Sequence, residues 1–177
     1  MKILEEQNLI ERDISPAGQN VKLAPAAVKL LSKEFADYKK IFRVREKIEL
    51  DGVLVSGLGE GRYYVSIDGY AKQFKEKLGF EPFPGTLNIK IKNHCLDLRK
   101  KMAELPFIKM DSFSDGARTY GAVDCYPAEI RGVCGYIIVP ERTHYQQDLL
   151  EMIAPANIRN QLNLKDGDTV SVIVKTE

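Results

Sequence analysis

The strongest constraint on the fold is a series of short β-type runs with few helical segments between them. Apolar and charged residues alternate in Phe42–Arg45 and Ile48–Leu50, and Val53–Val55 follows. Such alternation is typical of strands that turn one face toward a core. A doubly wound parallel sheet would need a regular helical crossover after each strand, and the sequence lacks these crossovers. We therefore predict a mainly β, α+β fold built as a closed or nearly closed barrel.

Turn and helix signals divide the rest of this region. Tyr63–Ile67 continues the β-type pattern, whereas Tyr70–Leu78 has helical spacing and ends at Gly79, a residue suited to the left-handed conformation after a helix. Ser114–Gly116 predicts a hairpin turn between Ile108–Met110 and Arg118–Ile130. The other expected elements are strands at Thr86–Ile91, Gly135–Val139 and Thr169–Lys175, and helices at Gln147–Ile153 and Asn157–Leu162.

The first forty residues have a different order of elements. Met1–Leu9 reads as a helical fragment, and Pro16–Gln19 is a turn signal between two short extended runs. Pro25 then opens a helix whose apolar residues recur at helical spacing. The predicted order is helix, hairpin, helix.

This segment resembles the wing and the following helix of winged-helix domains, through the phrase Leu9–Leu23. In that family the helix that enters the DNA major groove lies before the wing, where this chain has no residues. We expect residues 1–40 to be a truncated or degenerate winged helix that packs as an appendage on a domain at residues 41–177. DNA is therefore not an expected partner.

Composition argues against several classes of protein. The 177 residues carry a net charge of +1, so bulk charge does not indicate a nucleic-acid binder or a membrane-surface protein. Cys95, Cys125 and Cys134 are widely spaced and lack a C-x-x-C pair, which argues against a disulfide framework and a zinc site. Neither a signal-peptide core nor an apolar run of membrane-spanning length is present. We expect a cytoplasmic protein with no membrane partner.

The first functional signal is the loop Gly57-Leu58-Gly59-Glu60-Gly61-Arg62, hereafter the glycine loop. Alternate glycines let the backbone approach a bulky anion, and the guanidinium of Arg62 can bind phosphate through two bonds. The pattern is not a Walker A loop, and without a following helix it is not a dinucleotide-binding fingerprint. A plain tight turn explains the glycines equally well, and Glu60 would repel phosphate unless it bonds another group.

Pro84-Gly85-Thr86-Leu87-Asn88 gives the second signal. A strand places Thr86 and Asn88 on one face because side chains two residues apart point the same way. The two side chains offer a hydroxyl and an amide oxygen, which suit Mg²⁺ when a nucleotide supplies the negative charge. Taken alone, the segment is better explained by an ordinary strand entry with two solvent-facing polar residues.

The C-terminal third adds polar candidates. Glu151 lies in a mostly apolar stretch, where a partly buried carboxylate can accept a proton from a substrate hydroxyl or an exposed one can be inert. His144 is one of two histidines and is a candidate base, although a surface histidine is the commoner case. Pro155 precedes a short helix with Asn157 and Arg159 near its start, which offers backbone N–H groups and a cation, or an ordinary capped helix.

The order of these motifs resembles that of the archaeal riboflavin kinases. The resemblance covers about residue 46 to the C-terminus and rests on five motifs in family order: Ser56–Tyr63, Leu78–Pro82, Gly85–Asn88, Glu151–Pro155 and Leu164–Asp168. It implies a small six-stranded cradle-loop (RIFT-related) β-barrel that phosphorylates riboflavin to FMN with CTP as the donor and CDP as the second product. Some members carry an N-terminal winged helix.

The resemblance also implies roles at the matched positions. The cytidine nucleotide would be held by Gly57, Leu58, Gly59, Glu60, Gly61 and Arg62, and from the other side by Ala156, Asn157, Ile158 and Arg159. Thr86 and Asn88 would bind Mg²⁺, and Thr143 and Glu151 would contact the flavin. Glu151 is the hypothetical catalytic base or orienting acceptor. A flavin- or nucleotide-responsive transcription regulator is the alternative hypothesis, and a non-catalytic barrel module is the third.

Overall fold

The computed structural model describes residues 2–15, 18–41, 47–57, 59–141 and 148–175. The chain divides into two units, Met1–Val44 and Arg45–Glu177. The first unit comprises α1 (Lys2–Glu6), β1 (Ile10–Ser15), β2 (Gly18–Leu23) and α2 (Pro25–Ile41), with β1 and β2 paired as an antiparallel hairpin. The predicted order of helix, hairpin and helix is confirmed. The winged-helix assignment and the domain boundary after residue 40 stay predictions.

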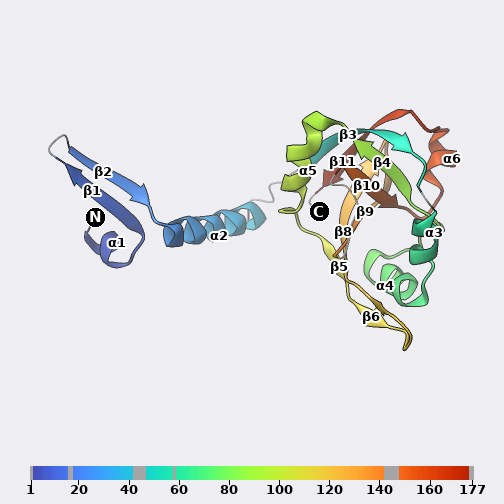
Figure 1. The fold of residues 1–177 in the computed structure, drawn as a ribbon, viewed down its shortest axis with the longest axis horizontal. Helices are drawn as coiled ribbons and strands as arrows, with labels where there is room; N and C mark the ends of the chain where they lie inside the picture. Colours follow the sequence, from blue (N-terminus) through green and yellow to red (C-terminus); the bar gives the residue numbers. More distant parts are fainter. Residues whose placement is uncertain (1, 16–17, 42–46, 58, 142–147, 176–177) are drawn as a thin grey trace. The chain divides into compact units, whose positions relative to one another are not determined.

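The second unit is built on one antiparallel sheet (Figure 1). Its strands, in spatial order, are β11 (Thr169–Lys175), β3 (Lys47–Val55), β4 (Leu87–Ile91), β10 (Leu149–Ile153), β9 (Val133–Pro140), β8 (Val123–Ile130) and β5 (Ile108–Met110). A further pairing of β11 with β8, at Ile173 with Glu129 and Val174 with Ala128, partly closes the sheet into a ring of six strands. The mainly β prediction is confirmed, and the cradle-loop barrel type stays a prediction.

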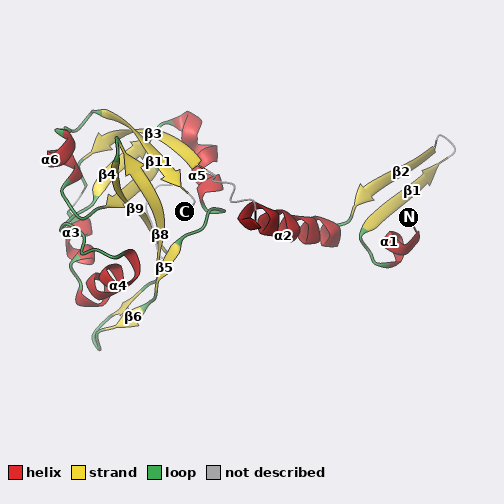
Figure 2. Ribbon diagram, turned by 180° about the vertical axis from the view of Figure 1, so that it is seen from behind, coloured by secondary structure: helices red, strands yellow, loops and turns green. Residues whose placement is uncertain are grey.

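The second unit also contains short helices and one small hairpin. They are α3 (Glu60–Val65), α4 (Asp68–Leu78), the 3₁₀ turn η1 (Asn93–Cys95), α5 (Leu96–Met102), α6 (Ile158–Leu162) and the hairpin of β6 (Phe113–Ser114) with β7 (Thr119–Tyr120). Figures 1 and 2 show α5 at the opposite end of the sheet from α3 and α6. None of the helices in the described ranges is long and apolar enough to cross a membrane.

Two apolar clusters fill the second unit. The first lies within the ring and includes alternate residues of β3 and β11, such as Leu50 and Val172, which are fully buried. The second lies where α4 and the β6–β7 hairpin cover the outer face of β8, β9 and β10, and it includes Phe74, Cys125 and Ile153. The sheet is thus covered on both faces along β8, β9 and β10.

Two predicted elements are wrong. Tyr63–Ile67 is not extended, because Glu60–Val65 forms α3 and its first turn contains the end of the glycine loop. The expectation that no helix follows this loop is therefore also wrong. Aromatic and β-branched composition favours a strand, but here tertiary packing of Val65 in the second apolar cluster overrides it. Leu149–Ile153, expected to be helical, is strand β10 with neighbours on both sides. A short apolar run that is buried on both faces cannot be told from a helix by its period.

Other expectations need smaller changes. Ile48–Leu50 and Val53–Val55 belong to one strand, β3. The η1–α5 segment, Asn93–Met102, carries no sequence prediction. The predicted strand Phe42–Arg45 lies outside the described residues. Gly79 ends α4 in the left-handed conformation, with φ 81°, as predicted.

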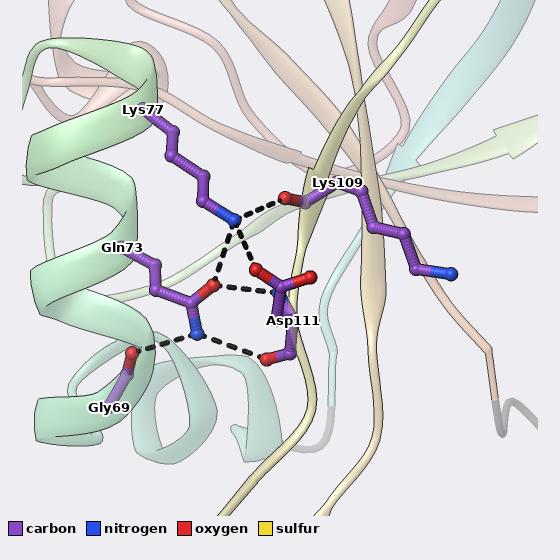
Figure 3. Close-up of polar contacts among 5 residues, drawn as sticks. All are labelled: Gly69, Gln73, Lys77, Lys109 and Asp111. Carbon is purple, nitrogen blue, oxygen red and sulfur yellow. Dashed lines mark hydrogen bonds and ion pairs between the residues drawn. The ribbon is translucent and has the colours of Figure 1, made fainter.

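Polar contacts fix α4 to the end of β5 (Figure 3). The Gln73 amide accepts from the Asp111 N–H (2.7 Å) and donates to the Asp111 carbonyl (3.0 Å), so it pairs with that residue as a neighbouring strand would. Lys77 Nζ donates to the Asp111 carboxylate (2.6 Å) and to the Lys109 carbonyl (2.8 Å). The start of the β6–β7 hairpin is therefore held against α4.

Candidate functional site

The glycine loop runs from the end of β3 into the first turn of α3 and lies against side chains at the start of β4. A Cβ atom at Gly57 would overlap the Asn88 amide, and one at Gly61 would overlap the Thr86 side chain. Gly59 has open space around it but a φ of 86°, which disfavours any residue with a Cβ. Gly57 and Gly61 are required because side chains approach them closely, and Gly59 is required because of its backbone conformation.

Thr86, Asn88 and Glu151 form one hydrogen-bonded group beneath this loop. Thr86 Oγ1 donates to Glu151 Oε1 (3.1 Å). With the Asn88 amide oriented to satisfy both neighbours, its nitrogen donates to Glu151 Oε1 (3.2 Å) and its oxygen accepts from the Gly57 N–H (3.3 Å). Asn88 is the single buried polar side chain in the described part of the chain, at 8% exposed. The glycine loop, β4 and β10 are thus tied together by polar contacts.

The strand register explains why this group lies at a polar-to-apolar border. Asn88 on β4 pairs with Glu151 on β10, and Glu151 pairs with Ile138 on β9. Ile138 in turn pairs with Cys125 on β8. Glu151 points to the same sheet face as Ile153, two residues on, and this is the face that α4 covers. The Glu151 carboxylate therefore has the polar side chains of Thr86 and Asn88 on one side and apolar residues such as Ile138 on the other.

Burial raises the pKa of Glu151 above the ordinary carboxyl value. The hydrogen bond from Thr86 acts in the opposite direction, and the negative charge of Glu60 raises the pKa further. A partly buried carboxyl with a raised pKa is a better proton acceptor than an exposed one once it is ionised. The site has the chemistry to orient a substrate hydroxyl and to accept its proton.

Arg159, near the start of α6, ties the entrance of the glycine loop to the C-terminal part of the sheet. Its Nη2 donates to the Val55 carbonyl (2.8 Å), and its Nη1 pairs with Asp166 Oδ1 (2.6 Å). Ser56 Oγ donates to the other oxygen of the same carboxylate. The Ser56 and Arg159 bonds hold the pKa of Asp166 below its usual value. The Arg159 guanidinium is therefore fixed beside Ser56, the residue that precedes Gly57.

A pocket opens between the β4 entrance and α6. Asn157 caps α6 by accepting from the Asn160 N–H (3.1 Å). The pocket is lined by Phe83, Gly85, Thr86, Leu87, Met152, Ala154, Ala156, Asn157, Ile158 and Arg159. Residues 156–159 and Thr86, which are 70 positions apart in the chain, thus share one cavity.

Comparison with known proteins decides the family. A family model named for the CTP-dependent riboflavin kinase domain, and described as domain of unknown function DUF120, matches residues 54–174. The chain belongs to this family. The "Riboflavin kinase" of Methanosarcina barkeri is 47% identical over 178 residues, which cover 100% of this chain and 79% of that protein. That of Methanosarcina acetivorans is 44% identical over 100% of this chain and 75% of the relative, and that of Archaeoglobus fulgidus is 46% identical over 98% and 75%. The protein is a kinase.

The positions predicted for the kinase site fall into two groups. The structure brings together Gly57, Gly61, Thr86, Asn88 and Glu151 in one group, and Thr86 with Ala156–Arg159 around the pocket. Glu60 and Arg62 are exposed at the start of α3. Leu58, Thr143 and His144 lie outside the described residues. The roles of all these residues stay predictions.

Sequence reasoning missed two residues that are bonded into the candidate site. Ser56 and Asp166 are 110 positions apart, and each appears in a quoted motif without a role. Their link to Arg159 depends on the pairing of β3 with β11, which brings the turn before β11 beside the glycine loop. Local patterns carry no such signal.

Proposed function

We propose that this kinase transfers the γ-phosphoryl group of CTP to the terminal ribityl hydroxyl of riboflavin, giving FMN and CDP. The observation that carries the proposal is the partly buried Glu151 carboxylate, which accepts hydrogen bonds from Thr86 and Asn88 beside the glycine loop. The family model and the names of the relatives support the reaction class and the substrate. The regulator alternative gains no support from relatives that are named as kinases.

Glu151 is the proposed acceptor of the ribityl hydroxyl proton. Phosphoryl transfer depends mostly on positioning and on stabilisation of charge. A carboxylate held by Thr86 and Asn88 on a central strand has a fixed direction, which suits it to orient the attacking hydroxyl. The proton leaves the hydroxyl oxygen as the bond to phosphorus forms, and Glu151 takes it.

The glycine loop and residues 156–159 are the proposed nucleotide site. Backbone N–H groups of the loop would meet phosphate oxygens, and Arg62 would add a cation. Arg159 is already held by Val55 and Asp166, so its proposed part is to hold the loop and to close the nucleotide side of the pocket. The preference for cytosine rests on the family model's name.

Thr86 and Asn88 would hold Mg²⁺. Their hydroxyl and amide oxygens, beside a carboxylate, are hard ligands that fit this ion better than a soft metal. When bound, Mg²⁺ neutralises phosphate charge. Thr143 is the proposed second contact to the flavin.

The test is to incubate purified protein with riboflavin and Mg²⁺, adding CTP or ATP in parallel, and to separate flavins by chromatography. FMN formed with CTP and little formed with ATP supports both the reaction and its donor. FMN with ATP alone would overturn the donor, and folded protein that makes no FMN with either nucleotide would overturn the function.

A further inference from the structure

A group of metal-ligand side chains lies on strand β3 and the turn η1, and the proposed reaction does not use it. It consists of Asp51, His94 and Cys95, hereafter the η1 cluster. One carboxylate oxygen, one imidazole nitrogen and the thiol sulfur all lie within 4.8 Å of one another. Within the ranges that the structure describes, this is the one place where three carboxylate, imidazole or thiol groups converge in this way.

Backbone hydrogen bonds hold the two segments of the η1 cluster together. β3 pairs with β4 through Gly52 and Ile91, and the Lys92 N–H then donates to the Asp51 carbonyl (2.9 Å). The Cys95 N–H donates to the Lys92 carbonyl (2.9 Å), which closes η1 beside β3. The three ligand groups are thus carried by backbone that is already fixed, which lowers the entropy that is lost when an ion binds.

The carboxylate and the imidazole already have the spacing of two ligands on one ion. His94 Nε2 and Asp51 Oδ2 are 3.6 Å apart. Tetrahedral zinc binds nitrogen and oxygen ligands at about 2.0–2.2 Å, which places such ligand atoms about 3.3–3.6 Å from each other. The imidazole is 64% exposed and the carboxylate 41%. An ion can therefore enter from solvent, and water can complete its coordination.

Cys95 supplies the ligand that decides which metal the η1 cluster suits. Its side chain is 2% exposed and packs in the first apolar cluster, so the sulfur reaches the two polar groups from the core side. The Asp51 N–H donates to this sulfur (3.4 Å). Such a bond favours the thiolate, which is the form that binds a metal. Together the thiolate and the Asp51 carboxylate carry two negative charges, which a divalent cation neutralises.

We propose that the η1 cluster binds one Zn²⁺ ion, which fastens η1 and α5 to β3. Mg²⁺ and Ca²⁺ prefer oxygen ligands, whereas a mixed set of sulfur, nitrogen and oxygen suits zinc. Binding releases the thiol proton to solvent. Zinc binds thiolate sulfur at about 2.3 Å, so the two exposed side chains must rotate to bring their ligand atoms about 1 Å closer to the sulfur.

This site is separate from the proposed Mg²⁺ site at Thr86 and Asn88. The η1 turn leads directly into α5, which lies at the opposite end of the sheet from α3 and α6 (Figures 1 and 2). Cysteine spacing gave no signal for a zinc site here, because the η1 cluster has one cysteine and joins segments 44 positions apart along the chain.

The test uses the whole chain, freed of metal with EDTA and dialysed, then titrated with Zn²⁺ by calorimetry and with Co²⁺ by absorption spectroscopy. Zn²⁺ should bind with a stoichiometry of one and raise the Tm, and Co²⁺ should give a thiolate-to-metal charge-transfer band. His94→Ala and Cys95→Ser should each raise the Kd for Zn²⁺ at least about tenfold, the low end of what loss of a group that supports a metal site costs. Cys95→Ser should also remove the charge-transfer band.

Two matched controls change the same kinds of side chain outside the η1 cluster. Cys134→Ser removes an exposed cysteine on β9, and Asp97→Asn removes an exposed carboxylate on α5. Both should keep the Kd for Zn²⁺ within about twofold, as surface substitutions away from a site do. Both should also keep the cobalt charge-transfer band.

Each further outcome decides the proposal. If the wild-type protein binds no Zn²⁺, the inference is wrong, and the three groups are an ion pair beside a core cysteine. If Zn²⁺ binds equally well to wild type, His94→Ala and Cys95→Ser, the ion lies elsewhere and the inference is again wrong. If Cys95→Ser fails to fold, His94→Ala decides, because its exposed side chain can be removed without opening the core. That variant should then lose both the affinity for Zn²⁺ and the rise in Tm.

Discussion

The contact between Gly61 and Thr86 gives the sharpest prediction about the site. Gly61 lies in the first turn of α3, where alanine would otherwise stabilise a helix by up to about 1 kcal/mol. Its added Cβ would overlap two atoms of the Thr86 side chain, Oγ1 and Cγ2. Overpacking of this kind typically costs about 1–3 kcal/mol, so the loop or Thr86 must move. Movement of Thr86 displaces the hydroxyl that bonds Glu151, and movement of the loop withdraws its backbone from Thr86.

Gly61→Ala should therefore lower kcat/KM by more than about tenfold, the equivalent of about 1.4 kcal/mol, with little change in the unfolding midpoint because helix propensity offsets part of the overlap. Steady-state FMN formation and thermal unfolding measure the two quantities. Gly79→Ala is the control: its φ of 81° makes alanine strained, yet nothing lies within 4 Å of the added atom. That variant should lose stability by about 1–2 kcal/mol and keep its kcat/KM. Wild-type kinetics from folded Gly61→Ala would show that close approach of the loop to Thr86 is not needed.

The remaining predictions concern Glu151, the two proposed metal ligands and Arg159. Glu151→Gln should abolish or sharply cut turnover while CTP binding by calorimetry is retained; unchanged turnover would remove Glu151 from the mechanism. Because the folded state holds the Glu151 proton more tightly than the unfolded chain, ionised Glu151 costs stability at neutral pH, and this cost disappears as pH falls through the raised folded pKa. Chemical denaturation at pH 7 should therefore find Glu151→Gln at least as stable as wild type, and wild-type kcat/KM should fall on acidification with a pKa above the ordinary carboxyl value. Thr86→Ala and Asn88→Ala should each raise the Mg²⁺ concentration needed for half-maximal activity, and an unchanged Mg²⁺ titration in both would refute the metal assignment. Arg159→Lys keeps the charge but cannot reach both Val55 and Asp166 with a planar fork, so the KM for CTP should rise several-fold; an unaltered KM would mean that the fork does not position the loop.

The sequence predicted most strands and helices of the fold, and the misses have identifiable causes. β11 and β3 show clear alternation because one face of each lies on the core. β10 shows no such alternation, because Leu149–Ile153 lies between two strands and its side chains are buried or half-buried on both faces. An apolar run of five residues has no distinctive period. α3 was missed because Tyr63 and Tyr64 favour strands by composition, whereas their observed place is set by contacts with the β6–β7 hairpin, more than fifty residues away.

The candidate site was predictable in its residues but not in its connections. Alternation on one strand correctly placed Thr86 and Asn88 on the same side, where both meet Glu151. The sequence could not reveal that Gly57 and Gly61 are needed for contact with these two side chains, because the pairing of β3 with β4 brings them together. The same limit applies to Ser56 and Asp166, whose link to Arg159 exists only in three dimensions.

The central claim is that Glu151, Thr86 and Asn88 beneath the glycine loop carry phosphoryl transfer from CTP to riboflavin. The most direct measurement is a single-turnover experiment with CTP labelled in its γ-phosphate, comparing wild-type protein with Glu151→Gln. We predict that the label appears in FMN, with unlabelled CDP, for wild type, and stays in CTP for the variant. Label that goes to inorganic phosphate instead of FMN, or that reaches FMN equally fast in both proteins, would contradict this account.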